Sequence, residues 1–175
     1  MNPQHRGPIN PRHQKYVNND KLIIKALCAI LRDRRINVRT AELYKLAKVS
    51  SPTFYLHYRD ANDARYSYER RLSLELAERV PKHARPQLFF TILMSLIKKH
   101  YSYFAAVAVS GDHYLLSKML LAHRKHLVSS DVDDCSFIIY ASHLQAIIGC
   151  WLWRHKHNDE PADRCVQDLL KVQPQ

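Results

Sequence analysis

The sequence is poor in glycine. Only three of its 175 residues are glycine, and Gly7, Gly111 and Gly149 lie far apart. Phosphate-binding loops of the G-x-G-x-x-G and G-x-x-x-x-G-K types need clustered glycines, so the nucleotide-binding folds that use them are excluded. There is also no Asn-Gly or Asp-Gly pair, which argues against a fold built from β-hairpins.

The cysteines and apolar segments are similarly sparse. The four cysteines, at positions 28, 135, 150 and 165, show no C-x-x-C spacing, which favours buried free thiols in a reducing compartment. The N-terminal segment is polar and carries three prolines, unlike a signal peptide. The longest apolar runs, such as 146–153, are shorter than the ~20 residues that cross a bilayer. We therefore expect a soluble cytoplasmic protein with no membrane partner.

What the chain does have is positive charge, unevenly distributed. The formal net charge is +11, and residues 1–58 contribute +8 of it, with 11 Lys and Arg against 3 Asp and Glu. A basic first third on a nearly balanced remainder indicates an anionic partner for that end, either nucleic acid or a membrane surface. The alternative is a solvated basic surface that only aids solubility.

Apolar residues in the first third recur at helical spacing. A flexible basic arm over 1–16 precedes a helix that Asn19 or Asp20 caps and that ends near Arg34. Thr40 is the expected cap of a short second helix. A third short helix begins at Pro52, which suits a first helical turn, and Ser50 or Ser51 caps it. Three such helices, with a tight break between the second and third, form a helix-turn-helix pattern.

The remainder of the chain is also helical in pattern, and no stretch alternates with a period of two. Expected helices cover residues 62–80, 87–101, 103–109, 113–127, 137–155 and a last segment opened by Pro161. The predicted fold is all-α. It divides into a flexible basic arm (1–16), a segment with the helix-turn-helix pattern (17–60) and a longer helical remainder (61–175).

The segment 38–58, VRTAELYKLAKVSSPTFYLHY, resembles the DNA-binding signature of the TetR/AcrR family of bacterial transcriptional regulators. The positions in register are Leu43, Ala47, Val49, Ser50, Thr53, Phe54, Tyr55, His57 and Tyr58. The resemblance implies an N-terminal three-helix DNA-binding domain and a C-terminal helical domain for ligand binding and dimerisation. It also implies a homodimer that binds palindromic double-stranded operator DNA, under the control of a small molecule.

The third helix carries the residue types that groove reading needs. Ser51, Pro52 and Thr53 are slim enough to let the backbone approach base edges. The hydroxyl of Tyr55 suits a phosphate, and His57 a second phosphate or a base. Phe54 and Tyr58 are instead expected to pack in the core. The predicted DNA-binding set is Thr40, Ser50, Ser51, Pro52, Thr53, Tyr55, Leu56 and His57.

Three positions depart from the family pattern, and one of them is Ala64, where the family usually has a leucine. Lys48 occupies the turn position that is usually glycine, where a left-handed lysine costs roughly 1–2 kcal/mol, so the turn is either strained or reshaped. Ala61 stands where the family has a phosphate-contacting lysine. Phosphate anchoring then falls to Arg59, Arg65 or the N-terminal arm, or the affinity for DNA is lower.

The C-terminal half offers two further candidate sets. By the resemblance, an apolar stripe pairs with a second subunit, with Gly149 allowing close approach; the alternative is that it faces its own core. The stripe is Ala141, Leu144, Ile148, Trp151 and Leu152. Tyr101, Phe104, Met119 and Trp151 are candidates for lining a ligand pocket, against the alternative of plain core.

No arrangement of residues predicts catalysis, a metal site or a cofactor. His123-x-x-His126 and His155-x-His157 lack a third ligand at a recognisable spacing and are expected to be surface histidines. Two other classes stay open. One is a helical interaction module that uses its basic end on acidic protein or membrane. The other is a small-molecule-binding helical protein with weakened DNA binding.

Overall fold

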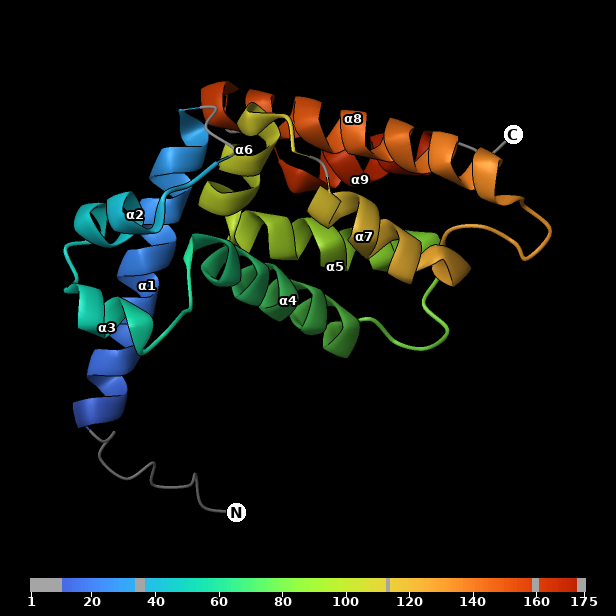
Figure 1. Cartoon of the computed structure of the whole chain (residues 1–175). Helices are drawn as coiled ribbons and strands as arrows, with labels where there is room; N and C mark the ends of the chain where they lie inside the picture. The colour runs from blue at the N-terminus through green and yellow to red at the C-terminus, as the bar shows by residue number, and fades with distance from the viewer. Residues whose placement is uncertain (1–10, 34–36, 113, 159–160, 173–175) are drawn as a thin grey trace, which may run out of the picture.

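The computed structural model describes residues 11–33, 37–112, 114–158 and 161–172, with the side chains of 11–13 and 156–158 left undescribed. Over these residues the chain forms nine α-helices, one 3-10 turn (Arg124–His126) and no strand, which confirms the all-α prediction (Figure 1). The helices are α1 (Pro11–Arg32), α2 (Thr40–Leu46), α3 (Ser51–Tyr55), α4 (Ala61–Arg79), α5 (Pro86–Lys99), α6 (Tyr101–Ser110), α7 (Tyr114–Ala122), α8 (Asp134–Asn158) and α9 (Ala162–Lys171).

Helix α1 begins earlier than the sequence predicts. Residues 11–16 were expected to belong to a flexible arm, but they form the first turns of α1. A proline at the start of a helix costs no hydrogen bond, so Pro11 is compatible with this beginning. The ring of Tyr16 also stacks on that of His57, with centroids 3.9 Å apart, which gives the first turns a tertiary contact. Residues 1–10 of the predicted arm lie outside the described residues.

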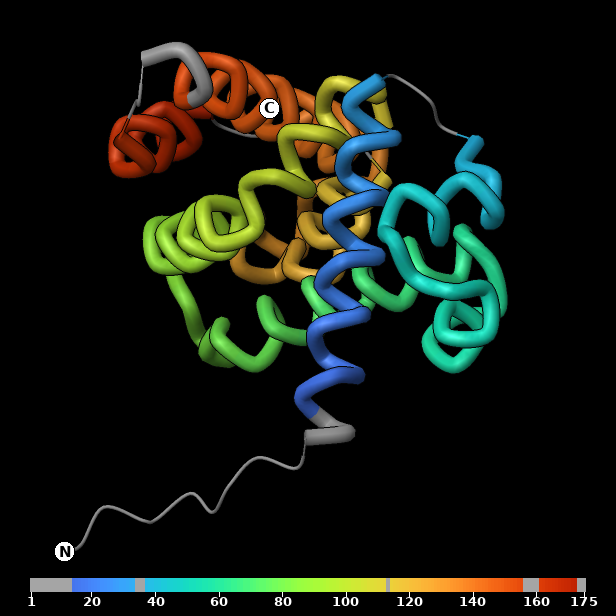
Figure 2. The backbone as a smooth tube through the Cα atoms, turned by 90° about the vertical axis from the view of Figure 1, so that its left-hand side faces the viewer, coloured from blue at the N-terminus to red at the C-terminus, as the bar shows by residue number. Residues whose placement is uncertain are grey.

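Helix α1 packs against two different parts of the molecule. It contacts α2 on one side and α6 and α4 on the other (Figure 2). Its buried residues therefore cover more than one face of the helix: Ile23, Ile24, Ala26, Leu27, Cys28, Ile30 and Leu31. The C-terminal end of α1 thus belongs to both the small N-terminal group of helices and the larger C-terminal group.

The larger group is a layered arrangement of α4 to α9. Helix α5 lies between α4 and α9, and α8 runs across α6, α7 and α9 (Figure 1). Its core is aromatic, and Phe89, Phe90 and Trp151 are each 0% exposed. The predicted turn after α6 is confirmed, because Gly111 ends that helix in the left-handed conformation with φ of 76°.

A buried charged cluster ties α4 to the turn after α6. The Arg65 guanidinium donates from Nε to Glu69 Oε1 at 2.9 Å and from Nη2 to Asp112. The hydroxyl of Tyr103 donates to the same Glu69 oxygen at 2.7 Å. Burial raises the pKa of Tyr103, so this hydroxyl keeps its proton and its role as donor. Because every charge has a partner, the cluster is tolerated inside the fold.

Helix α8 is the most apolar long segment. Its stretch from Asp134 to His155 is long and apolar enough to cross a membrane by length and composition, which the expectation of only short apolar runs had overlooked. The core helix of a soluble protein passes the same test. One face of α8 is buried against α6, α7 and α9.

Candidate functional site

The start of α3 is fixed by a side-chain cap. Ser50 has extended backbone geometry, and its Oγ accepts a hydrogen bond from the backbone N–H of Thr53 at 3.2 Å. The hydroxyls of Ser50 and Thr53 also bond to each other at 2.7 Å. Pro52 occupies the first turn, where its missing N–H costs nothing. The predictions of Ser50 as a capping residue and of Pro52 at the helix start are confirmed.

The turn between α2 and α3 passes through a left-handed residue. Lys48 has φ of 55° and is the only non-glycine residue of the described chain with positive φ. The backbone N–H of Val49 then bonds to the carbonyl of Tyr44 at 3.1 Å, which closes the end of α2. Of the two outcomes expected for Lys48, the structure shows the strained one. The lysine adopts the conformation for which a glycine would be suited.

Helix α3 is anchored by one side chain and exposes its neighbours. Phe54 is 0% exposed and contacts the rings of Tyr44 and Tyr58. Tyr55 is 56% exposed and Leu56 77% exposed. The burial expected for Phe54 and Tyr58 is confirmed, and α3 presents a partly apolar surface to its surroundings.

The remaining predicted contact residues of this region differ in accessibility. Pro52 is exposed, whereas Ser51 and Thr53 are half-buried. The half-buried His57 is held by the stacked ring of Tyr16, and burial lowers its pKa from the ordinary 6.5, so it is neutral at pH 7. As a neutral ring, His57 has one N–H to donate to an acceptor.

Thr40 does not cap α2 as expected. It is the first residue of the helix, and Arg39 holds the capping position without a side-chain hydrogen bond. Thr40 Oγ1 instead accepts a hydrogen bond from the backbone N–H of Ala61 at 3.1 Å. Since Ala61 begins α4, this bond brings the starts of α2 and α4 together. Capping by Thr40 was wrong by one position, but the hydroxyl does serve a helix start.

Two arginines were expected to contact phosphate in place of the lysine that Ala61 replaces. Their exposure to solvent differs sharply. The side chain of Arg59 is 89% exposed, with a long 3.5 Å contact to Asp63. The side chain of Arg65 is 14% exposed and is held by Glu69 and Asp112. Of this pair, only Arg59 is available to a partner.

A cluster that the sequence did not reveal joins the segment just after α3 to α1 and α4. The Tyr58 hydroxyl and the Arg71 guanidinium both bond to the carboxylate of Asp20, with Arg71 Nη1 2.8 Å from Oδ2. Asp20 was expected to cap a helix, but it lies in the middle of α1, and this pairing is its role. The partners lie 38 and 51 residues away along the chain, so no local pattern could have identified them.

The predicted dimer stripe lies in the core of the chain. All five residues are at most 7% exposed: Ala141, Leu144, Ile148, Trp151 and Leu152. They therefore occupy the position expected under the alternative of an intrachain core. The opposite face of α8 is exposed, including Ile138 at 62%, Ile139 at 60% and Trp153 at 64%. A Cβ added at Gly149 would meet no atom within 4 Å, so within one chain no close approach depends on this glycine.

The candidate pocket residues separate in the same way. Phe104 and Met119 are 2% and 1% exposed and pack in the core, as does Trp151. Tyr101 is half-buried, donates its hydroxyl to the carbonyl of Leu152 at 3.0 Å, and lines a cleft next to α1. Phe104, Met119 and Trp151 are not among the residues that line this cleft.

Of the two histidine pairs, the structure describes the first, because the side chain of His157 lies outside the described residues. His123 and His126 are buried beside Phe89, so the expectation that both lie at the surface was wrong. His126 Nδ1 lies 3.1 Å from the carbonyl of Ala84. In the part of the chain that the structure describes, no group of three His, Cys, Asp or Glu side chains could hold a metal ion.

The chain was compared with family models, curated proteins and solved structures. No family model, no curated protein and no solved structure gives a significant match.

Proposed function

We propose that this chain is a TetR-like transcriptional regulator that binds palindromic double-stranded DNA as a homodimer. In this proposal α2, the turn at Lys48 and α3 form a helix-turn-helix, and α3 enters the major groove. The carrying observation is that a capped, anchored helix presents Pro52, Tyr55 and Leu56 outward from the basic third of the chain.

The exposed side chains suit complementary parts of a duplex. Pro52 and Leu56 offer apolar contact to thymine methyl groups in the groove. The hydroxyl of Tyr55 and the guanidinium of Arg59 are free to reach phosphates on the flanking backbone. Thr40, Ser50 and Thr53 form hydrogen bonds within the chain, so we assign them chiefly to holding α2 and α3 in position.

Dimerisation is assigned to the outward face of α8. Exposed residues there recur at helical spacing and are mostly apolar: Ile138, Ile139, Ala146, Cys150 and Trp153. Such a face at the surface of one subunit is suited to burial against a second copy. A dimer whose reading helices lie about 34–36 Å apart would bind two half-sites one turn of DNA apart.

Selection from a pool of random duplexes tests the proposal directly. We expect enrichment of a palindrome, and log Kd for that duplex should change with log salt by about 0.9 per phosphate neutralised. Tyr55→Phe should weaken binding to all duplexes about tenfold by removing one charge-assisted hydrogen bond. Tyr114→Phe, an equally exposed tyrosine on α7, is the matched control and should leave binding unchanged.

Absence of any enriched sequence would contradict the DNA-binding proposal. Equal duplex affinity of Tyr55→Phe and Tyr114→Phe would contradict the role given to Tyr55. The dimer is tested separately by light scattering. Ile139→Asp should yield a monomer, and Leu74→Asp on the exposed face of α4 should not. A dimer that survives Ile139→Asp would place the interface elsewhere.

A helical small-molecule-binding protein with weakened DNA binding is the second candidate. It is favoured by one observation, a cleft with a volume of about 880 Å³ between α1 and the start of α6. This volume lies within the range of cavities that hold small organic ligands. The duplex selection separates the two candidates, because the second predicts no enriched palindrome.

A further inference from the structure

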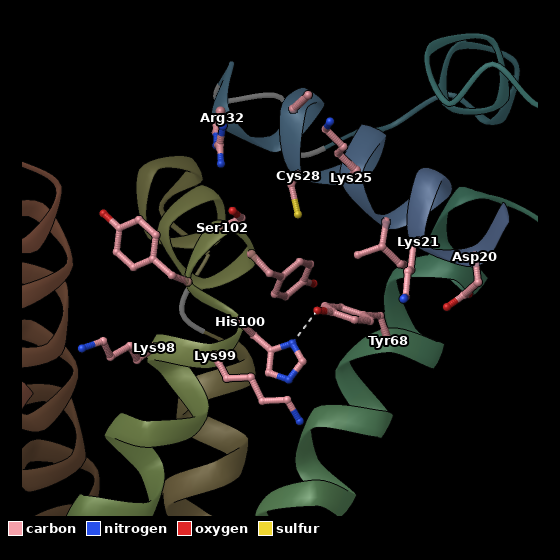
Figure 3. A pocket seen from close by; sticks show the side chains of 14 residues that line it. Asp20, Lys21, Lys25, Cys28, Arg32, Tyr68, Lys98, Lys99, His100 and Ser102 are labelled. Atoms are coloured by element: carbon pink, nitrogen blue, oxygen red, sulfur yellow. Dashed lines mark hydrogen bonds between the residues drawn. The ribbon is translucent and has the colours of Figure 1, made fainter. Parts of the chain in front are cut away.

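The cleft beside α1 combines a basic rim with an aromatic floor. One wall is α1, and the other is the junction where α5 ends and α6 begins (Figure 3). Lys21, Lys25 and Arg32 come from α1, and Lys98 and Lys99 come from the end of α5. Of the residues considered above for a C-terminal pocket, only Tyr101 lines this cleft.

The charge of the rim is strongly unbalanced. Five lysines and arginines line the cleft against one carboxylate, that of Asp20. Asp20 is already bound by Arg71 and Tyr58, so it does not neutralise the rim. Lys99 pairs with Glu75 at 2.8 Å. Among the described residues, no ion pair is formed by the other four basic side chains: Lys21, Lys25, Arg32 and Lys98.

The floor consists of rings whose polar atoms are satisfied. Tyr68 and Tyr103 meet edge to face with centroids 4.9 Å apart. The Tyr68 hydroxyl lies 2.8 Å from His100 Nδ1, while His100 Nε2 faces Glu75 at 3.3 Å. A neutral imidazole that donates from Nε2 and accepts at Nδ1 fulfils both bonds. The floor is therefore uncharged, and the half-buried Tyr68 supplies its accessible ring, because Tyr103 is only 1% exposed.

The Cys28 thiol also points into this space (Figure 3). Burial raises its pKa to about 11, so it is a neutral apolar group rather than a reactive thiolate. A ligand meets no competing negative charge on the floor.

We propose that this cleft binds a small anion with a flat apolar body. The acidic group, a phosphate, carboxylate or sulfonate, pairs with Lys21, Lys25 and Lys98 at the rim. The apolar body lies against the ring of Tyr68, which the buried ring of Tyr103 holds in place. The lysines of the rim select a ligand with negative charge, and the aromatic floor selects one with a flat apolar part. Both are therefore needed to define this ligand class.

Such a ligand would bridge two parts of the molecule. It contacts α1, which carries Asp20 and through it Tyr58 just after α3, and it contacts α6 in the larger helical group. Bound ligand would favour one arrangement of α1 relative to α6. An effect of this ligand on the affinity for duplex DNA rests on the proposed function. Binding of the ligand to the cleft does not depend on that function.

Fluorescence titration with anilinonaphthalene sulfonate, without DNA, tests the site. The neutral comparison probe is phenylnaphthylamine, which has the same rings and lacks the sulfonate. We expect Lys21→Gln/Lys25→Gln to raise the Kd of the sulfonate probe about tenfold and to leave the neutral probe unaffected. Lys82→Gln/Lys118→Gln removes the same charge from exposed positions outside the cleft and is the matched control.

A second variant tests location rather than charge. Ser102 is exposed and lines the cleft, so Ser102→Trp should fill the space and reduce binding of the sulfonate probe at least as much. Competition with naphthyl phosphate and naphthoate then shows which acidic group the rim prefers, and displacement by either supports the site. Displacement by neither, equal affinity of cleft and control variants, or equal binding of both probes would overturn the proposal. Because no duplex is present, failure here is distinct from failure of DNA binding.

Discussion

Helices α3 and α8 both expose apolar side chains, but they are held in place in different ways. Helix α3 has 5 residues and one buried side chain, Phe54. Helix α8 has 25 residues, and one of its faces is buried in the core. A helix as short as α3 does not form by itself, because nucleation is unfavourable and few hydrogen bonds follow. Its position therefore depends on one anchor, one cap and one turn, whereas α8 is fixed by packing along its length.

Substitution of Phe54, the anchor of α3, should give the largest effect among the tests of how α3 and α8 are held in place. Phe54→Ala should lower the free energy of unfolding by about 3–5 kcal/mol, since a fully buried aromatic side chain is removed. Both tryptophans lie on α8, so urea unfolding followed by tryptophan fluorescence reports on that helix, and circular dichroism reports on all helices. We expect the two transitions to shift together, because α1 is shared. The control is Tyr55→Ala, which should change stability by at most about 0.5 kcal/mol. Equal costs for the two variants would show that Phe54 is not an anchor.

The buried charged cluster tests the larger group of helices. Glu69→Gln removes the charge that faces Arg65 and should cost about 1–3 kcal/mol, with Asp112 still in place. Asp168→Asn breaks the more exposed pair with Lys171 and should cost clearly less than Glu69→Gln, because solvent screens this pair. The measurement is urea unfolding of both variants. If Asp168→Asn costs as much as Glu69→Gln, burial does not set the value of these pairs.

The turn before α3 should tolerate glycine better than lysine. Lys48→Gly should raise the free energy of unfolding by about 1 kcal/mol, because it removes the cost of a left-handed side chain. Lys48→Ala should bring no such gain. Lys45→Gly, inside α2, is the positional control and should lose about 1 kcal/mol. Destabilisation by Lys48→Gly would mean that the lysine side chain contributes more than its backbone costs.

Acidification should produce the smallest effect, and it reaches both groups of helices. Burial lowers the pKa of His57, His100 and His123 from the ordinary 6.5. Below that value the unfolded chain binds more protons than the folded chain, so stability is retained above pH 6.5 and falls as the pH decreases. Melting temperatures between pH 7.5 and 5 measure the slope. His57→Gln and His123→Gln should each reduce it, and an unchanged slope in both would contradict this origin.

The sequence predicted the helices better than their contacts. Local signals such as Pro52, Ser50 and Gly111 act over a few residues, and the structure places their turns and caps as expected. The early start of α1 was missed because the stabilising stack of Tyr16 on His57 joins residues 41 positions apart. The stripe on α8 was correctly identified as apolar. Spacing alone did not show whether it faced the core or a partner, because both faces of the helix are apolar.

The candidate site also contains residues that the sequence marked and contacts that only the fold creates. The resemblance of the segment 38–58 to a known DNA-binding signature marked Tyr55 and Leu56, and both are exposed. The rim of the cleft was invisible in the sequence, since Lys21 and Lys98 lie far apart along the chain and meet only after α1 packs on α6. The role of Asp20 was hidden for the same reason.

The shared packing of α1 has a consequence for modularity. A fragment that ends before α4 would expose the side of α1 that α4 and α6 cover. The first three helices are therefore not an independent unit. Transferring them to another protein would require redesign of that surface. Substitutions on α1 and α6 are constrained jointly, so we expect the two helices to vary in a correlated way during evolution.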